Sequence, residues 1–177
     1  MERKNRIVKN LNIGLESLLQ KNGISVLKGK GIVTALHEIQ VETKEGNIQV
    51  TCEKMILASG SRPFIPEIPG IHLKGVITST EALNLSQIPE SMAILGAGVI
   101  GVEFATCFAA LGTKVTLLEK QKEFLPETGE EAPKEILKHL KRLGIGFRFQ
   151  SQIIKIEKGD QGLSITYDTG EKKEQLS

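Results

Sequence analysis

One stretch of the chain, residues 92–105, most constrains the fold, because it combines an apolar strand, a glycine turn and the start of a helix. Gly96, Gly98 and Gly101 have the spacing G-x-G-x-x-G. In this motif the first glycine permits a tight turn, the second lets the backbone approach a pyrophosphate, and the third lets the helix pack closely on its strand. The first N–H groups of the helix have no intrahelical partner and attract phosphate. The stretch therefore predicts a dinucleotide-binding turn.

Three neighbouring features strengthen this prediction. A loop with the chain breaker Pro89 precedes the strand. The helix is predicted to carry one apolar face and to end at Gly112. That face consists of Ile100, Phe104, Cys107, Phe108 and Leu111. A second strand, residues 114–119, follows and ends in an acid.

The acid at the end of this second strand, Glu119, predicts the choice of cofactor. It follows Gly101 at close to the roughly 20-residue spacing that is typical of a ribose-binding carboxylate. Such a carboxylate accepts hydrogen bonds from the adenosine ribose hydroxyls and repels a 2′-phosphate, so NAD is expected rather than NADP. The alternative is a strand, turn and helix that bind nothing.

Composition excludes few classes of protein. The chain is 40% hydrophobic and 25% charged, which is ordinary for a globular protein, and its net charge of +2 gives no sign of nucleic-acid or anionic-membrane binding. No run of residues approaches membrane-spanning length and no signal peptide is visible, so a cytoplasmic location is expected. Cys52 and Cys107 have no metal-binding spacing and are predicted to be core thiols, and no metal site is expected.

The remaining pattern predicts a series of short elements. Residues 5–21 have helical spacing that ends at Gly23, and residues 24–27 read as a strand. Alternating residues between 31 and 52 predict an antiparallel meander, and residues 54–58 predict an apolar strand before the turn at 59–63. A short helix is expected around 81–85. A loop containing Pro126 and Gly129 leads to a helix over 132–143, a strand after Gly144, and hairpins over 153–170.

These elements form a repeated plan. Around both Gly23 and Gly144, a helix ends, Gly-Ile follows, and a short strand leads into a meander with glycine turns. The first copy lacks a preceding strand, glycine motif and helix, and the second stops before a strand that would match 54–58. The sequence thus predicts an α/β protein with two Rossmann-like dinucleotide-binding units, each with a β-meander insertion and each incomplete, as in an internal fragment of a longer protein.

The order of features resembles the flavoprotein pyridine nucleotide-disulfide oxidoreductases, which have two dinucleotide domains. Within that family it looks most like the dihydrolipoamide dehydrogenases. The resemblance is carried by residues 56–63, Pro69-Gly70, Ser79-Thr80, Ile88-Pro89, the glycine motif through Glu103, and Glu119. It covers nearly the whole chain.

The resemblance implies two domains and an FAD contact. Residues 1–85 would form the C-terminal half of an FAD-binding domain, and residues 86–177 an NAD-binding domain without its last strand. Ser59, Gly60 and Ser61 would lie against the flavin, although the family usually has Thr at position 59, and Gly31 would approach the adenine end of FAD. The alternative is that these four are ordinary turn residues.

The resemblance also extends the NAD site along the helix. Val99 would lie where nicotinamide enters over the flavin, and Glu103 would hold the nicotinamide carboxamide, unless Glu103 only offsets the helix dipole. Ile153 matches a family position near the adenine. The complete predicted NAD set is Gly96, Ala97, Gly98, Val99, Ile100, Gly101, Val102, Glu103, Glu119 and Ile153.

No catalytic residue is expected in this chain. The family's C-x-x-x-x-C dithiol and its C-terminal His–Glu pair are absent, and His37, His72 and His139 do not lie in such a motif. The resemblance implies that the full-length protein oxidises dihydrolipoamide through the redox disulfide and FAD and reduces NAD to NADH. Its implied partners are a second subunit in a homodimer and the lipoyl domains of 2-oxo acid dehydrogenase or glycine cleavage complexes. The chain alone is expected to be inactive.

Two kinds of alternative remain open. Mercuric reductase, soluble transhydrogenase and NADH oxidase share the domain and differ in parts that this sequence lacks. A shortened, non-enzymatic NAD-binding module, or the product of a degraded gene, belongs to a different functional class.

Overall fold

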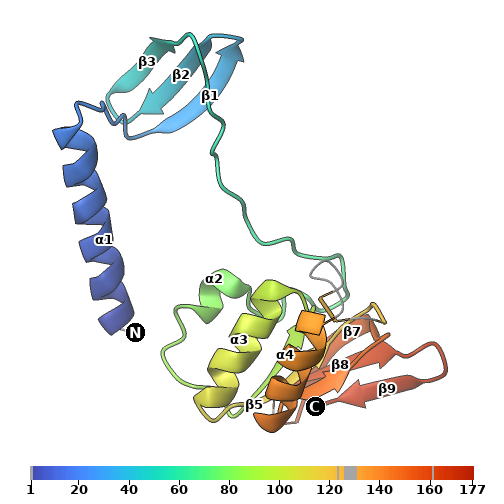
Figure 1. The fold of residues 1–177 in the computed structure, drawn as a ribbon. Coiled ribbons are helices and arrows are strands. Elements are labelled where there is room, and N and C mark those ends of the chain that lie inside the picture. The colour runs from blue at the N-terminus through green and yellow to red at the C-terminus, as the bar shows by residue number, and fades with distance from the viewer. Residues whose placement is uncertain (1, 123, 126–130, 161) are drawn as a thin grey trace. The chain divides into compact units, whose positions relative to one another are not determined.

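The computed structural model describes residues 2–122, 124–125, 131–160 and 162–177. The chain forms two compact units, Met1–Arg62 and Pro63–Ser177, each of which is described by itself (Figure 1). These two units are defined by which residues pack together. The predicted boundary at residue 85 is a different one, between an FAD-binding and an NAD-binding domain, and it stays a prediction.

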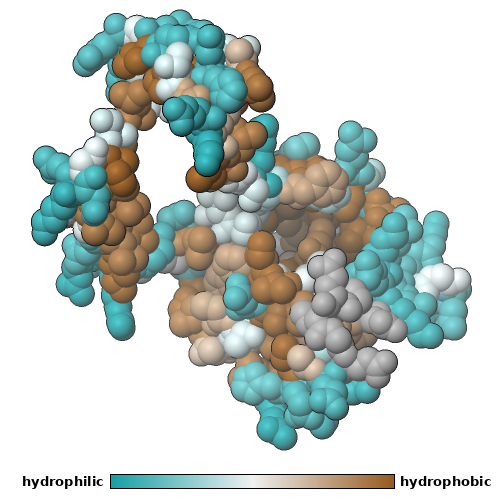
Figure 2. Space-filling model, turned by 45° about the horizontal axis from the view of Figure 1, so that its top comes forward, coloured by the Kyte–Doolittle hydropathy of each residue, from teal (hydrophilic) through white to brown (hydrophobic). Residues whose placement is uncertain are grey.

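The first unit contains the helix and the meander that the sequence predicts. Helix α1 (Glu2–Lys21) ends before Gly23, whose φ of +68° suits glycine. Strands β1 (Lys30–Ala35), β2 (Glu38–Thr43) and β3 (Gly46–Thr51) form an antiparallel sheet in that order. No residue of α1 is buried, and its Leu11 is 67% exposed. Figure 2 shows apolar surface along one side of the helix.

The two further strands predicted in the first unit are wrong. Residues 24–27 and 54–58 have no strand assignment, and Ile56 and Leu57 are 90% and 75% exposed. A strand exists only when its backbone N–H and C=O groups bond to a neighbouring strand. The one sheet among the described residues of this unit is the meander, which these segments do not join. The apolar composition of these two segments therefore predicted strands that do not pair with any neighbouring strand.

The second unit is built on a parallel sheet with strand order β4-β5-β6. Strands β4 (Ser91–Leu95), β5 (Lys114–Leu118) and β6 (Gly146–Arg148) are connected by helices α3 (Val99–Ala110) and α4 (Glu131–Arg142). A short helix, α2 (Ser79–Ala82), precedes them and begins with a capping box between Thr78 and Glu81. The predicted loop positions Pro126 and Gly129 lie outside the described residues.

A second antiparallel meander follows the parallel sheet. It consists of β7 (Gln152–Gly159), β8 (Gly162–Asp168) and β9 (Lys173–Leu176), in that order. The hairpins predicted over 153–170 are confirmed by this sheet. Together, the parallel sheet with its helices and the two meanders confirm the predicted α/β class.

The predicted apolar face of α3 is largely wrong. The helix buries Val102, Ala105 and Phe108, whereas Ile100 is 61% exposed and Leu111 is 52% exposed. Because α3 is apolar on nearly all sides, spacing alone does not tell which side meets the sheet. The side that meets the sheet is centred on Ala105, which is 0% exposed.

The prediction that both cysteines are core thiols is also wrong. Cys107 is exposed, because α3 turns this side of the helix away from the core, and Cys52 is half-buried. His139, on α4, is exposed.

Near the start of the second unit, the segment around Gly70 is hydrogen-bonded to the unit's meander at β7. The Ile156 N–H donates to the Pro69 carbonyl across 2.8 Å, and Gly70 has φ +86°. A Cβ at Gly70 would overlap the Ile156 carbonyl oxygen. The residue is therefore restricted to glycine both by its backbone angle and by contact.

We expect Gly70→Ala to destabilise the second unit by more than Gly112→Ala. Gly112 has a similar φ of +95° but open space around an added Cβ, so alanine there costs only the left-handed conformation, about 1–2 kcal/mol. At position 70 the Ile156 carbonyl must also move. Tyr167 is the chain's single tyrosine and the chain has no tryptophan, so denaturant unfolding followed by tyrosine fluorescence reports this unit. If both variants lose the same free energy of unfolding, contact with the Ile156 carbonyl does not contribute to the requirement for glycine at position 70.

Candidate dinucleotide-binding site

The three glycines between β4 and α3 meet three different requirements. Gly96 has φ +104°, and its N–H donates to the Leu118 carbonyl at 2.8 Å, which joins the turn to β5. A Cβ at Gly101 would overlap the Gly96 carbonyl oxygen, so the helix packs against the turn. These two glycines are required by the fold itself.

Gly98 is different, because neither its backbone nor its packing requires glycine. It is the N-cap of α3 with φ −74° and ψ 179°, which any residue adopts, and a Cβ there would meet nothing within 4 Å. No side chain caps this end of the helix. The turn therefore leaves open space in front of N–H groups that α3 does not use. That space is where a phosphate would bind.

Glu119 lies directly beside this turn. Its Oε2 accepts the Ala97 N–H at 2.8 Å, and its Oε1 accepts the Gln121 N–H at 2.7 Å. A carboxylate has about four acceptor positions, so each oxygen keeps the capacity for a further donor. The half-buried side chain is thus fixed in place without being saturated.

The backbone of Glu119 is fixed as firmly as its side chain. Its N–H donates to the Arg148 carbonyl at 2.8 Å, and its carbonyl accepts the Ser151 N–H at 2.8 Å. Strand β6 and the loop after it therefore hold the end of β5. In open parallel sheets, ligands bind at this carboxyl edge.

The structure thus brings together Gly96, Ala97, Gly98 and Glu119 of the predicted NAD set. Ala97 and Val102 are buried at 2% and 9% exposure, so only their backbones are available to a ligand. Ile100 is exposed on α3 after Val99. Val99 and Glu103, at helical spacing i and i+4, are both exposed, which leaves their side chains accessible.

The remaining NAD candidate, Ile153, lies on β7. It is half-buried and directly opposite Tyr167 on β8. Two residues before it, Ser151 bonds to the Glu119 backbone. The chain therefore connects Ile153 to the end of β5.

The four FAD candidates lie in the first unit. Ser59, Gly60 and Ser61 are exposed and outside any helix or strand, and Gly60 has φ +74°. Gly31 lies in β1, where a Cβ would make only ordinary contact with Ile39 at 3.7 Å. Its predicted contact with FAD, like those of residues 59–61, stays a prediction.

Sequence analysis missed a polar network that joins β6 to the second meander. The Arg148 Nε donates to the Tyr167 hydroxyl at 3.2 Å, and this hydroxyl donates to Glu174 Oε2 at 2.7 Å. Lys172 pairs with the other oxygen of Glu174 at 2.9 Å. Three separate segments contribute these groups, so no local pattern reveals the network.

The network shifts the pKa of three of its members. The hydrogen bond to Glu174 raises the pKa of Lys172. Burial, and then the bond to Glu174, raise the pKa of Tyr167, an effect that Arg148 only partly opposes. The hydrogen bond from Lys172, and then the bond from Tyr167, lower the pKa of Glu174. The neutral phenol beside an ionised carboxylate is therefore the favoured state near neutral pH.

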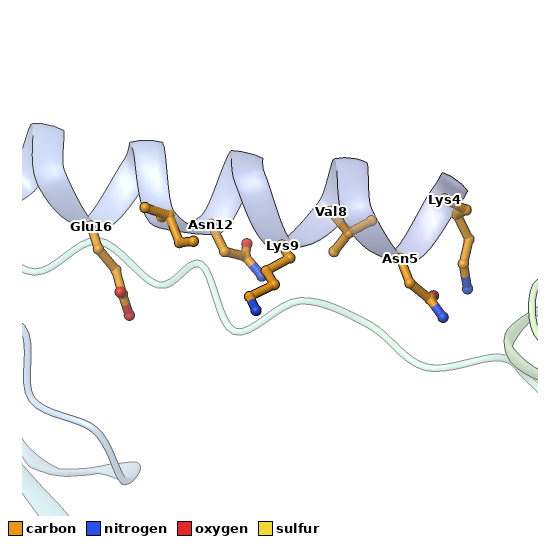
Figure 3. A pocket seen from close by; sticks show the side chains of 7 residues that line it. Lys4, Asn5, Val8, Lys9, Asn12 and Glu16 are labelled. Carbon is orange, nitrogen blue, oxygen red and sulfur yellow. The ribbon is translucent and has the colours of Figure 1, made fainter. Parts of the chain in front are cut away.

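Other features of the described residues offer less for a ligand. Figure 3 shows a shallow hollow along α1 lined by Asn5, Lys9, Glu16 and their neighbours on this single helix. Within the described part of the chain, no three His, Cys, Asp or Glu side chains are placed to hold a metal ion. The helices in that same part include none that is long and apolar enough to span a membrane.

A protein-family model described as pyridine nucleotide-disulphide oxidoreductase matches residues 2–176. The chain belongs to this family. The predicted resemblance to the flavoprotein disulfide reductases is thereby confirmed.

Pyridine nucleotide-disulphide oxidoreductases from several organisms are similar to the chain. It is 37% identical over 161 residues to the dihydrolipoyl dehydrogenase of Acholeplasma laidlawii, covering 89% of this chain and 47% of that protein. It is 32% identical to the leghemoglobin reductase of Glycine max, covering 95% and 32%. The solved structure of the HOCl-induced flavoprotein disulfide reductase RclA from Escherichia coli matches with TM-score 0.82 and 32% identity, covering 99% and 39%. The chain thus spans about a third to a half of these relatives.

We expect Tyr167 to titrate above its ordinary pKa of about 10 in the folded chain. Because folding raises this pKa, the phenol contributes stability that is fully present below pH about 10 and is lost as the pH rises through the folded value. The ultraviolet absorbance of the single tyrosinate measures the titration directly. The same chain unfolded in urea is the control and should titrate near 10; equal midpoints would contradict the buried network.

Proposed function

We propose that this chain is the NAD-binding portion of a dihydrolipoamide dehydrogenase, which oxidises dihydrolipoamide through a redox disulfide and FAD and reduces NAD to NADH. The observation that carries the proposal is the Glu119 carboxylate, bonded to the Ala97 N–H of the open glycine turn at 2.8 Å. It combines a phosphate-binding turn and a ribose acceptor at one sheet edge. The relatives named dihydrolipoyl dehydrogenase support the choice within the family.

The residues of the second unit fit a dinucleotide in one orientation. The pyrophosphate would lie at the start of α3, in the open space beside Gly98. The adenosine ribose hydroxyls would donate to the free acceptor positions of Glu119. Val99 and Glu103 would face the nicotinamide, and Ile153 the adenine. Bound NAD supplies the hydride-accepting ring, while these residues bind and orient it.

The wider assignments rest on the same proposal. Residues 1–85 would belong to an FAD-binding domain, with Gly31, Ser59, Gly60 and Ser61 against that cofactor, and residues 86–177 to the NAD-binding domain. The whole protein would act in the cytoplasm as a homodimer that receives lipoyl domains of 2-oxo acid dehydrogenase or glycine cleavage complexes. No nucleic-acid or membrane partner is proposed.

Other members of the family are the main alternatives. Mercuric reductase, soluble transhydrogenase and NADH oxidase would use the same nucleotide site, and the similarity to an Escherichia coli reductase at 32% identity favours no single substrate. A non-enzymatic NAD-binding fragment is the alternative from another class. The reading frame on either side of this segment distinguishes them, because a C-x-x-x-x-C dithiol and a His–Glu pair belong only to the enzymes.

Glu119→Arg is expected to reverse the preference for NADH over NADPH. The change replaces an acceptor for ribose hydroxyls with a guanidinium that pairs with the 2′-phosphate. Kd values for both nucleotides, measured from the fluorescence of the bound reduced cofactor, test this. Glu171→Arg, at an exposed position after β8, is the control with the same change in charge and should keep the preference for NADH. If Glu119→Arg still favours NADH, the ribose assignment is wrong.

The isolated chain is expected to bind NADH more tightly than NADPH and to show no dihydrolipoamide dehydrogenase activity. It has the glycine turn and Glu119 but no C-x-x-x-x-C dithiol to accept electrons. Calorimetric titration with NADH, NADPH and FAD, together with a dehydrogenase assay, measures both expectations. Tight retention of FAD by this chain would contradict the assignment of its first 85 residues to half of a flavin site.

A further inference from the structure

A single residue, Arg148, links the predicted ribose acceptor to the second meander. Its carbonyl accepts the Glu119 N–H at 2.8 Å, while its Nε donates to the Tyr167 hydroxyl at 3.2 Å. The first bond belongs to the end of the parallel sheet, and the second reaches β8 of the neighbouring sheet. The backbone that positions Glu119 is therefore attached through one side chain to a different layer of the unit.

The attachment point on the meander is buried and hydrogen-bonded. Tyr167 is only 2% exposed, and it lies opposite Ile153 on β7 and Glu174 on β9. Its hydroxyl donates to Glu174, so the oxygen lone pairs remain available to Arg148. A second nitrogen of the guanidinium, NH1, donates to the Phe147 carbonyl at 2.9 Å, which limits its rotation.

We propose that Arg148 and Tyr167 are positioning residues for the adenosine half of the bound dinucleotide, because their hydrogen bond holds the end of β6 where it fixes Glu119. This inference rests on the proposed NAD-binding function. A carboxylate that receives two ribose hydroxyls must be held within about half an ångström of its place. The Glu119 backbone bonds to residues 148 and 151 at the start of the link to β7, so movement there would displace the carboxylate from the ribose.

Tyr167 also lies directly opposite Ile153, so the strand that carries the phenol is paired with the strand that carries the predicted adenine-facing residue. This pairing is made by the backbone and is kept in Tyr167→Phe. The direct effect of removing the hydroxyl therefore falls on the bond to Arg148 and, through it, on Glu119. The nicotinamide-facing positions Val99 and Glu103 lie on α3 and do not take part in this network.

The test compares Tyr167→Phe with Ser164→Ala in the full chain. Each variant removes one buried hydroxyl from β8: Ser164 is 5% exposed and accepts a bond from the Gln175 Nε2 at 2.6 Å, a contact between β8 and β9 that leaves Arg148 untouched. We expect Tyr167→Phe to raise Kd about fivefold for NADH and for ADP-ribose, equivalent to about 1 kcal/mol. Ser164→Ala should lower stability but leave both Kd values unchanged. Nicotinamide mononucleotide should bind both variants as it binds the unchanged chain.

A double-mutant cycle with Glu119→Gln distinguishes an effect of Tyr167 on the position of Glu119 from a general loss of stability of the second unit. If the phenol acts through Glu119, the Tyr167→Phe change should add little to the loss in a chain that already carries Glu119→Gln. Amide hydrogen exchange without any ligand gives a second measure. The Glu119 and Ala97 amides should exchange faster in Tyr167→Phe, and not in Ser164→Ala.

Three results would overturn the inference. If the two β8 variants weaken NADH binding equally, the effect is one of stability alone. If the losses from Tyr167→Phe and Glu119→Gln are fully additive, the phenol does not act through Glu119. In either case Glu119→Gln would still weaken NADH binding, so the proposed function would stand. If the unchanged chain binds no NADH, both the nucleotide site and its positioning residues are wrong.

Discussion

The organisation of the second unit depends on the hydrogen bonds that meet where β5 ends. At this point the Glu119 backbone bonds to Arg148 and Ser151, and its carboxylate bonds to Ala97 and Gln121. One residue thereby connects the glycine turn, the third strand and the loop that starts the second meander. Because these bonds are made within the protein, the proposed ribose acceptor is already held in place without a ligand. A nucleotide that bound there would not have to bear the cost of ordering it.

The same bonds explain how a carboxylate is held beside the proposed phosphate-binding turn without blocking it. An acid close to a pyrophosphate would repel it, yet Glu119 is directed by two backbone N–H groups toward the side of the turn at Ala97. The start of α3, with its uncapped N–H groups, is left for the anion. A dinucleotide that carries both phosphate and ribose hydroxyls matches this separation of charge and acceptor.

The sequence revealed the parts of the fold that are coded locally. Glycine spacing, strand alternation and helical periodicity located β4, α3 and β5, both meanders, and the acid that directly follows β5, Glu119. It failed where the outcome depends on a distant partner: residues 24–27 and 54–58 lack a neighbouring strand, and the buried side of α3 is chosen by contact with the sheet around Ala105. Arg148, Tyr167 and Glu174 escaped notice because their three segments meet only in the folded chain.

The three glycines of the turn would be conserved by different kinds of selection. Gly96 and Gly101 are needed for the chain to fold, by backbone angle and by packing, whereas Gly98 borders open space and adopts an angle that suits any residue. A lineage released from nucleotide binding but still required to fold would lose Gly98 first. The relative rates of drift at these neighbouring positions would thus record when binding ceased to be under selection, separately from when the fold did.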